Sequence, residues 1–258
     1  MALSSIVKEL FDRIYSEDFE AQKNFIDYIC QGVRNMDSEI LYKARAIFIP
    51  NNEYLIEMGG SHVLDESNGL YEHGECIWIS NIVFPFFDLN GDIVGFGGFN
   101  PETYLRVHET NDWTMNYYRY SSKNIMQKGK YLYMLPGTFE KAYNDGYLCV
   151  TDGLFDTLHL EHFGYNAGAL SGSSLTIEML AQLRVIKKVI IMSDNDSAGL
   201  KLEERMKKHL HNCVYFHQGV TKDVDAILKT EHKDKFLQVL DDCVKSKFLI
   251  DSYYTPKL

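Results

Sequence analysis

The spacing of apolar positions divides the chain into three stretches, and the first of them is helical. Over residues 1–45 the segment "SIVKELFDRIYSEDFEAQKNFIDYICQGV" repeats apolar residues every three or four positions. The repeating positions are Ile6, Leu10, Ile14, Phe25 and Ile29. This spacing is typical of amphipathic helices. Ser16 is a candidate N-cap between two such helices, because a serine hydroxyl can accept a hydrogen bond from an unpaired backbone N–H.

The second stretch, residues 50–135, has the sequence pattern of β-strands. It runs from "NEYLIEMGG" through "GECIWISNIVFPFFDLNGDIVGFGGFNPETYL", and Asn90–Gly91 separates two apolar runs. Asn-Gly favours the positive backbone angles of a tight turn, so the pair predicts a β-hairpin. We therefore expect residues 1–145 to form a mixed α+β subdomain with an amino-terminal helical segment.

The third stretch, residues 146–230, alternates strands with helices. The expected strands are "YLCVTDG", "NAGALSG", "KKVIIMSD" and "NCVYFH", and the expected helices are "LFDTLHLEHFG", "SLTIEMLAQLR" and "SAGLKLEERMKKHL". Strands that alternate with helices of about ten residues predict a parallel sheet with right-handed crossovers and helices on both faces. The fold class is therefore α/β here, and residues 231–258 are expected to be a helical carboxyl-terminal segment.

Aspartates follow the predicted strands where ligand sites of open parallel sheets lie. They are Asp152 and Asp156 after the first strand, Asp194 and Asp196 after the third, and Asp223 and Asp225 after the fourth. If the first and third strands are neighbours, these carboxylates meet at one edge of the sheet. Carboxylates at close range repel one another unless a cation is bound, and oxygen ligands suit Mg²⁺ or Mn²⁺. Each aspartate taken singly is also explained as a helix cap or a turn residue.

Composition limits the classes of function. With 258 residues, 45% hydrophobic and 24% charged, the chain is a folded globular protein of one or two domains. A net charge of −10 argues against a protein that coats nucleic acid by charge alone, so any polyanion must be held locally. No apolar stretch is long enough to cross a bilayer, no secretion signal is visible, and the five cysteines contain no CxxC pair. We expect a cytoplasmic protein with no membrane partner.

The ordered segments "TDGLFDTL", "SGSSL", "IIMSDNDSAGLK" and "TKDVDAIL" resemble the Toprim domain, the metal-binding fold of bacterial-type primases, topoisomerases and related nucleases. The first motif of that domain usually carries a glutamate, and this chain has Asp152, one methylene shorter. The preceding region narrows the resemblance to DnaG-type primases, because Lys128, Gly129, Leu132 and Tyr133 match a K-G-x-x-L-Y motif. The resemblance covers roughly residues 80–230.

Three positions depart from the primase pattern. Asn81 and Phe99 stand where arginines are expected, and Asn116 stands where a lysine is expected. Between residues 100 and 130 a local basic strip survives, because five cations outnumber three acids there. The cations are Arg106, Arg119, Lys123, Lys128 and Lys130.

The resemblance implies a DNA primase core that synthesises short RNA primers on single-stranded DNA from NTPs by two-metal nucleotidyl transfer. Asp152, Asp194, Asp196 and Asp223 would hold Mg²⁺ or Mn²⁺, with Asp225 as an auxiliary ligand. Asp152 and Asp156 would be catalytic, the first as general base or ligand and the second orienting it. The positions expected to bind nucleotide or template phosphates are Arg119, Lys123, Lys128 and Lys130. The tyrosines of "YYRY" could stack on bases, although a half-buried strand explains them equally well.

No cysteine and histidine set here has the ligand spacing of the family's zinc module, and the residues after Asp225 leave no room for a helicase-binding domain. We therefore expect a minimal primase core, of a kind that a phage could encode, which relies on a replicative helicase or a separate template-recognition protein. Two alternatives stay open. The acidic residues could serve a Toprim nuclease that hydrolyses phosphodiesters, or the chain could be a degenerate primase acting as a non-catalytic replisome scaffold or loader.

Overall fold

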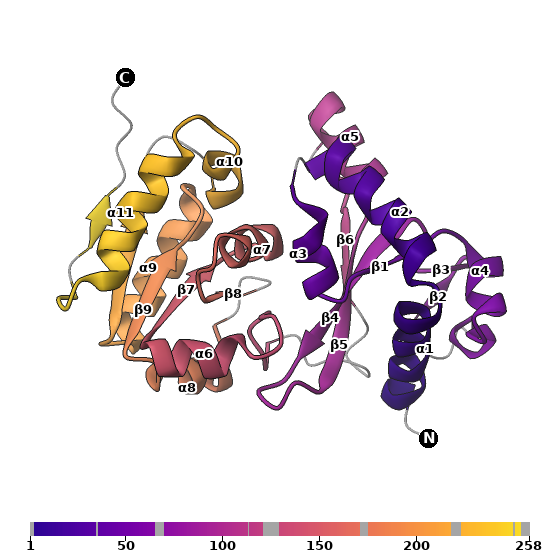
Figure 1. Cartoon of the computed structure of the whole chain (residues 1–258), viewed down its shortest axis with the longest axis horizontal. Coiled ribbons are helices and arrows are strands. Elements are labelled where there is room, and N and C mark those ends of the chain that lie inside the picture. The colour runs from indigo at the N-terminus through magenta and orange to yellow at the C-terminus, as the bar shows by residue number, and fades with distance from the viewer. Residues whose placement is uncertain are drawn as a thin grey trace. The chain divides into compact units, whose positions relative to one another are not determined.

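The computed structural model describes residues 3–34, 36–64, 70–112, 114–120, 129–170, 175–217, 223–249 and 251–253. The chain divides into two compact units, Met1–Lys128 and Gly129–Leu258. In Figure 1 the first unit runs from indigo to magenta and the second from pink to yellow. Among the described residues, no helix is both long and apolar enough to span a bilayer.

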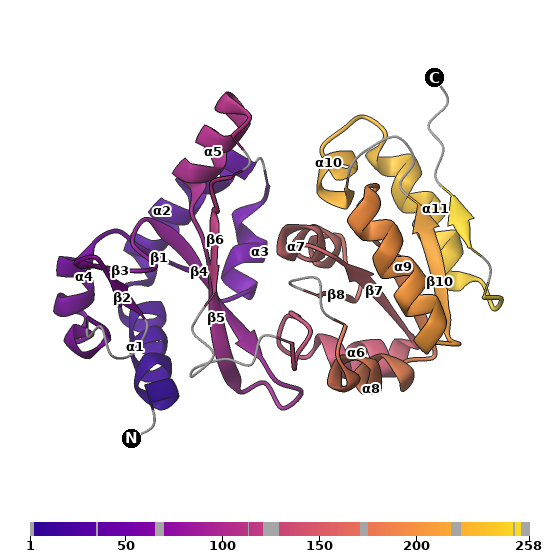
Figure 2. The same cartoon turned by 180° about the vertical axis from the view of Figure 1, so that it is seen from behind.

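The first unit is built on an antiparallel sheet of four strands in the order β1-β4-β5-β6 (Figures 1 and 2). The strands are β1 (Ile47–Ile49), β4 (Asn81–Phe87), β5 (Ile93–Phe99) and β6 (Tyr118–Tyr120), with a separate hairpin of β2 (Tyr71–Glu72) and β3 (Glu75–Cys76). The helices are α1 (Leu3–Glu17), α2 (Phe19–Ile29), α3 (Ser38–Lys43), α4 (Asn52–Glu57) and α5 (Pro101–Thr110). A π-helical turn (Cys30–Arg34) follows α2, and a 3-10 turn (Ser61–Val63) follows α4.

The hairpin predicted at Asn90–Gly91 is confirmed. β4 pairs with β5 in antiparallel register, and Gly91 has the positive φ of 84° that the turn requires. Two helices, α4 and α5, lie in the stretch that we expected to be β-rich. The asparagine before each helix accepts a hydrogen bond from a backbone N–H in the first turn of that helix. These caps favour a helix over the strand that the apolar pattern of the segments indicates.

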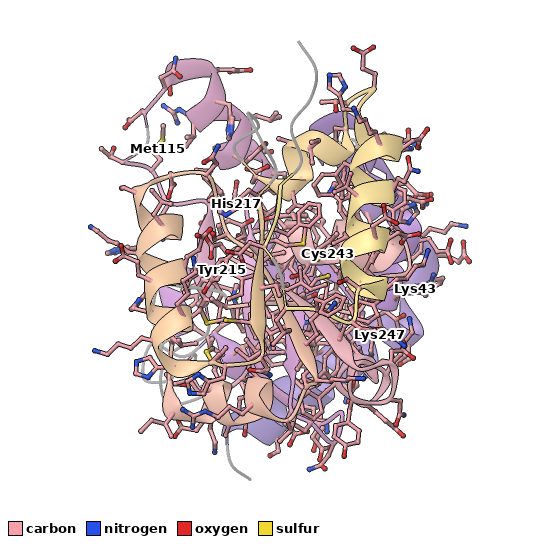
Figure 3. All side chains as sticks on the ribbon, turned by 90° about the vertical axis from the view of Figure 1, so that its left-hand side faces the viewer. Lys43, Met115, Tyr215, His217, Cys243 and Lys247 are labelled. Carbon is pink, nitrogen blue, oxygen red and sulfur yellow. The ribbon has the colours of Figure 1, made fainter. Side chains whose placement is uncertain are left out.

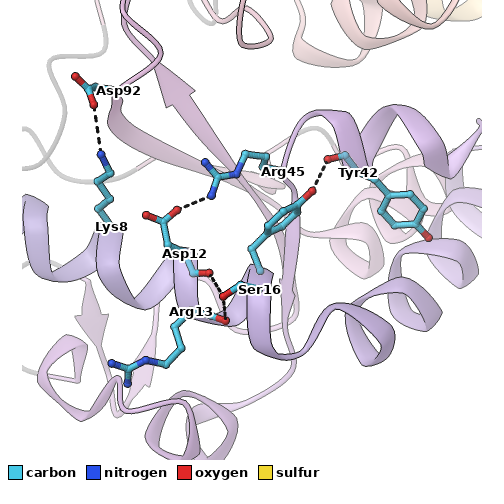
Figure 4. Close-up of polar contacts among 8 residues, drawn as sticks. Lys8, Asp12, Arg13, Ser16, Tyr42, Arg45 and Asp92 are labelled. Atoms are coloured by element: carbon cyan, nitrogen blue, oxygen red, sulfur yellow. Dashed lines mark hydrogen bonds and ion pairs between the residues drawn. The ribbon is translucent and has the colours of Figure 1, made fainter.

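The amino-terminal helices are present as predicted, but the boundary between the first two differs. Ser16 lies inside α1, where its hydroxyl donates to the carbonyl oxygens of Asp12 and Arg13 (Figure 4). Asp18 takes the N-cap position of α2, so the prediction for Ser16 was wrong. A serine hydroxyl can satisfy itself on the preceding helical turn, which removes its advantage as a cap. α1 is tied to its surroundings by an ion pair between Arg45 and Asp12, with a distance of 2.5 Å.

β1 lies at one edge of this sheet, and a side chain of α2 satisfies its outward-facing backbone. The amide of Gln22, which is 2% exposed, accepts the N–H of Phe48 at 2.5 Å and donates to the Phe48 carbonyl oxygen at 2.9 Å. The same Nε2 atom also lies 2.8 Å from the hydroxyl of Tyr54. A buried amide of this kind is stable only because its polar atoms are paired.

The second unit holds a parallel sheet in the order β11-β10-β9-β7-β8. The strands are β7 (Tyr147–Thr151), β8 (Ala167–Ala169), β9 (Lys188–Met192), β10 (Cys213–His217) and β11 (Ser252–Tyr253). The helices are α6 (Thr138–Asp145), α7 (Leu154–His162), α8 (Ile177–Arg184), α9 (Ser197–His209), α10 (Val224–Leu228) and α11 (Lys233–Lys245). The four strands predicted from the sequence are present, and the first and third of them are neighbours.

Helices cover both faces of this sheet, as the α/β pattern predicts. Alternate strand residues point to opposite faces, so Val150 and Ile191 pack with α6, α8 and α9, whereas Cys149 and Ile190 pack with α7, α10 and α11. Figure 3 shows Tyr215 on β10 and Cys243 on α11 among these side chains. Tyr133, from the K-G-x-x-L-Y motif, is fully buried and exchanges two backbone hydrogen bonds of 2.8 Å with Ala169 of β8.

Candidate functional site

The first and third acidic motifs meet because β7 and β9 pair in parallel. Asp152 follows β7 and Asp194 follows β9, and the backbone N–H of Asp194 donates to Oδ2 of Asp152 at 3.2 Å. α9 approaches this turn closely, since a methyl group on Gly199 would lie 2.0 Å from the carbonyl oxygen of Asp194. The turn therefore needs glycine at position 199, and the two acids are fixed within one loop pair.

The carboxyl of Asp152 is held in an unfavourable environment. Burial raises its pKa above the ordinary value, the Asp194 N–H lowers it, and the charges of Asp196 and Glu203 raise it further. Glu203, on α9, is 8% exposed and accepts a hydrogen bond of 2.8 Å from the hydroxyl of Ser193. We did not predict Glu203 from the sequence. The indication in the sequence was a charged residue between Leu202 and Met206, two apolar residues that lie about one helical turn apart on α9.

Asp156 lies in the first turn of α7 and is 7% exposed. Its Oδ1 accepts the backbone N–H of Asp225 at 2.7 Å, and its Oδ2 lies 2.6 Å from the position that a Cβ on Gly153 would take. Burial raises the pKa of Asp156 well above the ordinary range, and the charges of Asp223, Asp225 and Asp194 add to the effect. The acids of all three predicted motifs therefore influence one carboxyl group.

Two of the six aspartates also cap helices, as the alternative explanation proposed. Oδ1 of Asp196 accepts the N–H groups of Ala198 and Gly199 at the start of α9, and Oδ1 of Asp223 accepts the N–H of Ala226 at the start of α10. Asp196 is exposed and Asp223 half-buried, so their carboxylates remain accessible while they cap. Capping and ion binding are compatible at these positions, because a carboxylate offers about four lone pairs.

Asp225 has a different environment. Its Oδ2 lies 2.8 Å from Nζ of Lys229, and its Oδ1 lies 2.5 Å from Nδ1 of His159. The two atoms do not have the angles of a hydrogen bond, so the interaction with His159 is a close polar contact. Both oxygens of this buried carboxylate are already engaged by cationic or N–H-bearing groups.

The six aspartates, here called the acidic edge, fit a divalent cation by their chemistry. All the donors are carboxylate oxygens, which Mg²⁺ and Mn²⁺ prefer. Burial is the main reason why the pKa values of Asp152 and Asp156 are raised, and a cation would relieve the repulsion between acids that adds to it. Within the described ranges, no three Asp, Glu, His or Cys side chains already converge on one ion position. Binding would therefore require some of these side chains to turn toward one another.

The basic residues predicted to bind phosphates are only partly described. Lys130 is exposed, and its ammonium group lies 5.5 Å from the centre of the Tyr131 ring. Arg119 lies in β6, but its side chain falls outside the description, as do Lys123, Lys128 and the predicted turn at residues 171–174.

Two of the positions that depart from the primase pattern lie together. Asn81 and Asn116 line one pocket of about 380 Å³ in the first unit, with Asn100 and Thr103. Phe99 is fully buried, and its ring packs against Tyr104, Tyr117 and Tyr118. The tyrosines of "YYRY" thus have packing partners in the fold, which supports the half-buried-strand explanation for them.

Comparisons with known proteins agree with this architecture. A family model described as Toprim-like matches residues 149–228. The DNA primase of Clostridium acetobutylicum is 26% identical over 269 residues, covering 92% of this chain and 42% of that protein. The crystal structure of the Aquifex aeolicus primase zinc-binding and RNA polymerase domains superposes with a TM-score of 0.72 at 21% identity, covering 93% of this chain and 60% of that one. A DnaG primase catalytic domain bound to single-stranded DNA gives 0.66 at 20% identity, covering 92% and 80%.

These relatives share the fold of the chain over nearly its whole length. The chain spans about two fifths of the length of the primases it matches in sequence. The matches cover residues of both units of this chain.

Proposed function

Because this chain has the fold of a DnaG-type primase core with a Toprim-like domain, we propose that it is a DNA primase core. It would synthesise short RNA primers on single-stranded DNA from NTPs, in the cytoplasm of a bacterium or of a phage host. The observation that carries the proposal is the meeting of Asp152, Asp156 and Asp194 at the carboxyl edge of the parallel sheet.

In the proposed reaction each part of the acidic edge has its own task. When bound, Mg²⁺ or Mn²⁺ supplies charge neutralisation at the triphosphate and acidifies the attacking 3′-hydroxyl. Asp152, Asp194, Asp196 and Asp223 hold the ions. Asp152 would act either as one of these ligands or as the general base that accepts the hydroxyl proton. Asp156, fixed between Gly153 and the Asp225 N–H, keeps the others in place.

Phosphates would be neutralised outside the acidic edge. Arg119, Lys123, Lys128 and Lys130 are the proposed contacts with template and nucleotide phosphates. With few cations and a net charge of −10, the chain would bind template weakly alone, so we propose a replicative helicase or a template-recognition protein as its partner.

Labelled NTPs, a single-stranded DNA template and Mg²⁺ or Mn²⁺ test the proposal directly. We expect template-dependent RNA oligonucleotides from the wild-type chain, more of them with a cognate helicase, and none from Asp194→Asn. Asp242→Asn is the matched control, because Asp242 is exposed on α11. Shortened DNA without RNA synthesis would identify a nuclease. Equal support of replication by wild type and Asp194→Asn would identify a non-catalytic scaffold.

A further inference from the structure

α10 is attached to α7 by a buried polar contact that the reaction described above does not use. α10 has only five residues, too few to be a stable helix without tertiary support. Asp225 lies in its first turn, and the side chain of Asp225 is 13% exposed. A buried carboxylate is costly unless it is paired, so its partners determine where α10 sits.

The partner from α7 is His159. It lies three residues after Asp156, on the same face of the helix, and its side chain is 6% exposed. Its Nδ1 lies 2.5 Å from Oδ1 of Asp225. One face of α7 thus presents both a carboxylate acceptor for the Asp225 backbone and a polar partner for its side chain.

The second partner is Lys229, the C-cap of α10, whose Nζ lies 2.8 Å from Oδ2 of Asp225. Lys229 supplies a full positive charge next to the buried carboxylate. Both oxygens of Asp225 have side-chain partners and its side chain is 13% exposed, so an ion reaches it less easily than it reaches Asp196 or Asp223. Its backbone N–H, in contrast, donates directly to Asp156.

We infer that His159, Asp225 and Lys229 form a brace that positions the acidic edge, and that Asp225 is a positioning residue rather than a metal ligand. The role of the brace in metal binding rests on the proposed function, but the brace itself does not. It fixes the start of α10, where Asp223 lies, against the first turn of α7, where Asp156 lies. Loss of His159 should free α10 and separate these two acids.

The first experiment needs no metal. Backbone amide hydrogen exchange of α10 is compared in the metal-free wild type, His159→Ala and His159→Asn, with His162→Ala, from the last turn of the same helix, as control. We expect exchange of the α10 amides to rise about tenfold in His159→Ala, the effect of losing one buried polar contact. Asn should restore protection, because its Nδ2 occupies the place of Nδ1 in histidine. Unchanged exchange in His159→Ala would overturn the brace.

The second experiment measures Mn²⁺ affinity by calorimetry in the same folded variants, with Asp225→Asn and the double variant His159→Ala/Asp225→Asn. Removal of a group that orients metal ligands weakens affinity about 10- to 100-fold. We expect that loss in His159→Ala, recovery in His159→Asn, and a double variant no weaker than Asp225→Asn alone. If Asp225 were a ligand, Asp225→Asn would weaken binding and His159→Ala would not, which would overturn the reassignment.

Two further outcomes separate this inference from the proposed function. A wild-type chain that binds no Mn²⁺ would refute the metal-dependent reaction, and hydrogen exchange would then decide the brace alone. If His159→Ala does not fold, Lys229→Met takes its place, since Lys229 is half-buried and its loss removes the other partner of Asp225. Protection of α10 in Lys229→Met equal to that of the wild type would count against the brace.

Discussion

The backbone N–H of Asp194 donates to the carboxylate of Asp152, 42 positions earlier in the chain. This bond joins the turns after two neighbouring parallel strands, β7 and β9. It brings one acid of the first motif and one of the third to hydrogen-bonding distance.

Replacement of Asp156 by asparagine should stabilise the metal-free protein. Burial raises the pKa of Asp156 in the folded chain, so the unfolded chain releases this proton first as pH rises. The free energy of unfolding therefore falls from about pH 4, the unfolded value, up to the folded pKa, and stays reduced above it. At pH 7 we expect Asp156→Asn to melt about 2–4 °C higher for each kcal/mol recovered.

Thermal melts at pH 7 and pH 4 check this prediction. The advantage of Asp156→Asn should shrink at pH 4, where the wild type regains its proton, and again in Mg²⁺, where a cation would compensate the charge. A variant that melts lower than the wild type at both pH values would show that the charge of Asp156 does not destabilise the folded chain.

Gly199→Ala should destabilise the second unit. The added methyl group would meet the carbonyl oxygen of Asp194 at 2.0 Å, so α9 or the acidic turn must shift. We expect a loss of about 1–3 kcal/mol, typical of overpacking, measured by urea denaturation. Gly32→Ala is the matched control, because a methyl group there meets nothing within 4 Å. Equal losses in both variants would contradict the close approach.

Lys188→Met should loosen α11. The ammonium group of Lys188 is buried in the second unit and bonds the carbonyl oxygens of Cys243, at 2.8 Å, and Ser246, at the end of α11. Methionine leaves these oxygens without a donor, which costs about 1–3 kcal/mol. Urea denaturation of Lys188→Met against Lys187→Met, whose side chain is exposed, checks the loss.

Asn116→Lys should strengthen binding of single-stranded DNA. Asn116 is exposed and lines the pocket that it shares with Asn81, so an ammonium group placed there adds one phosphate contact at most. The slope of log affinity against log salt should steepen by about 0.7. Fluorescence anisotropy over a range of salt concentrations measures the slope, and Glu109→Gln, which removes an exposed charge on α5, controls for net charge. An unchanged slope would mean that nucleic acid does not reach this pocket.

The sequence was most informative about the second unit, and for a physical reason. Buried parallel strands such as "VIIM" are short continuous apolar runs bounded by polar turns, so both their position and the acids that follow them could be predicted. The pairing of β7 with β9 was only a condition of the sequence prediction, and the structure shows it. β11 was missed because two residues carry no periodicity, and α4 because its capping asparagine outweighs a strand-like texture.

The roles within the acidic edge were less predictable. Asp223 and Asp225 belong to one Asp-x-Asp sequence after a strand. Among the described residues, however, the carboxylate of Asp225 contacts a side chain from another helix, whereas that of Asp223 caps its own helix. Partners such as His159 and Glu203 lie on helices, where their spacing is also that of ordinary core or surface positions. Such contacts depend on how helices pack, and pairwise side-chain geometry is not encoded in local spacing.

The pairing of Gln22 with Phe48 bears on how the chain behaves at high concentration. A strand whose outward N–H and C=O groups are open can recruit a strand from a second molecule, and growth from such a seed leads to aggregates. The Gln22 side chain of α2 pairs with the outward N–H and C=O of Phe48, so these groups of β1 are not open to a further strand. Helix α2 thus protects the edge strand β1 from pairing with a second molecule, in addition to its part in the core. Shortened forms that lack the amino-terminal helices should aggregate more readily.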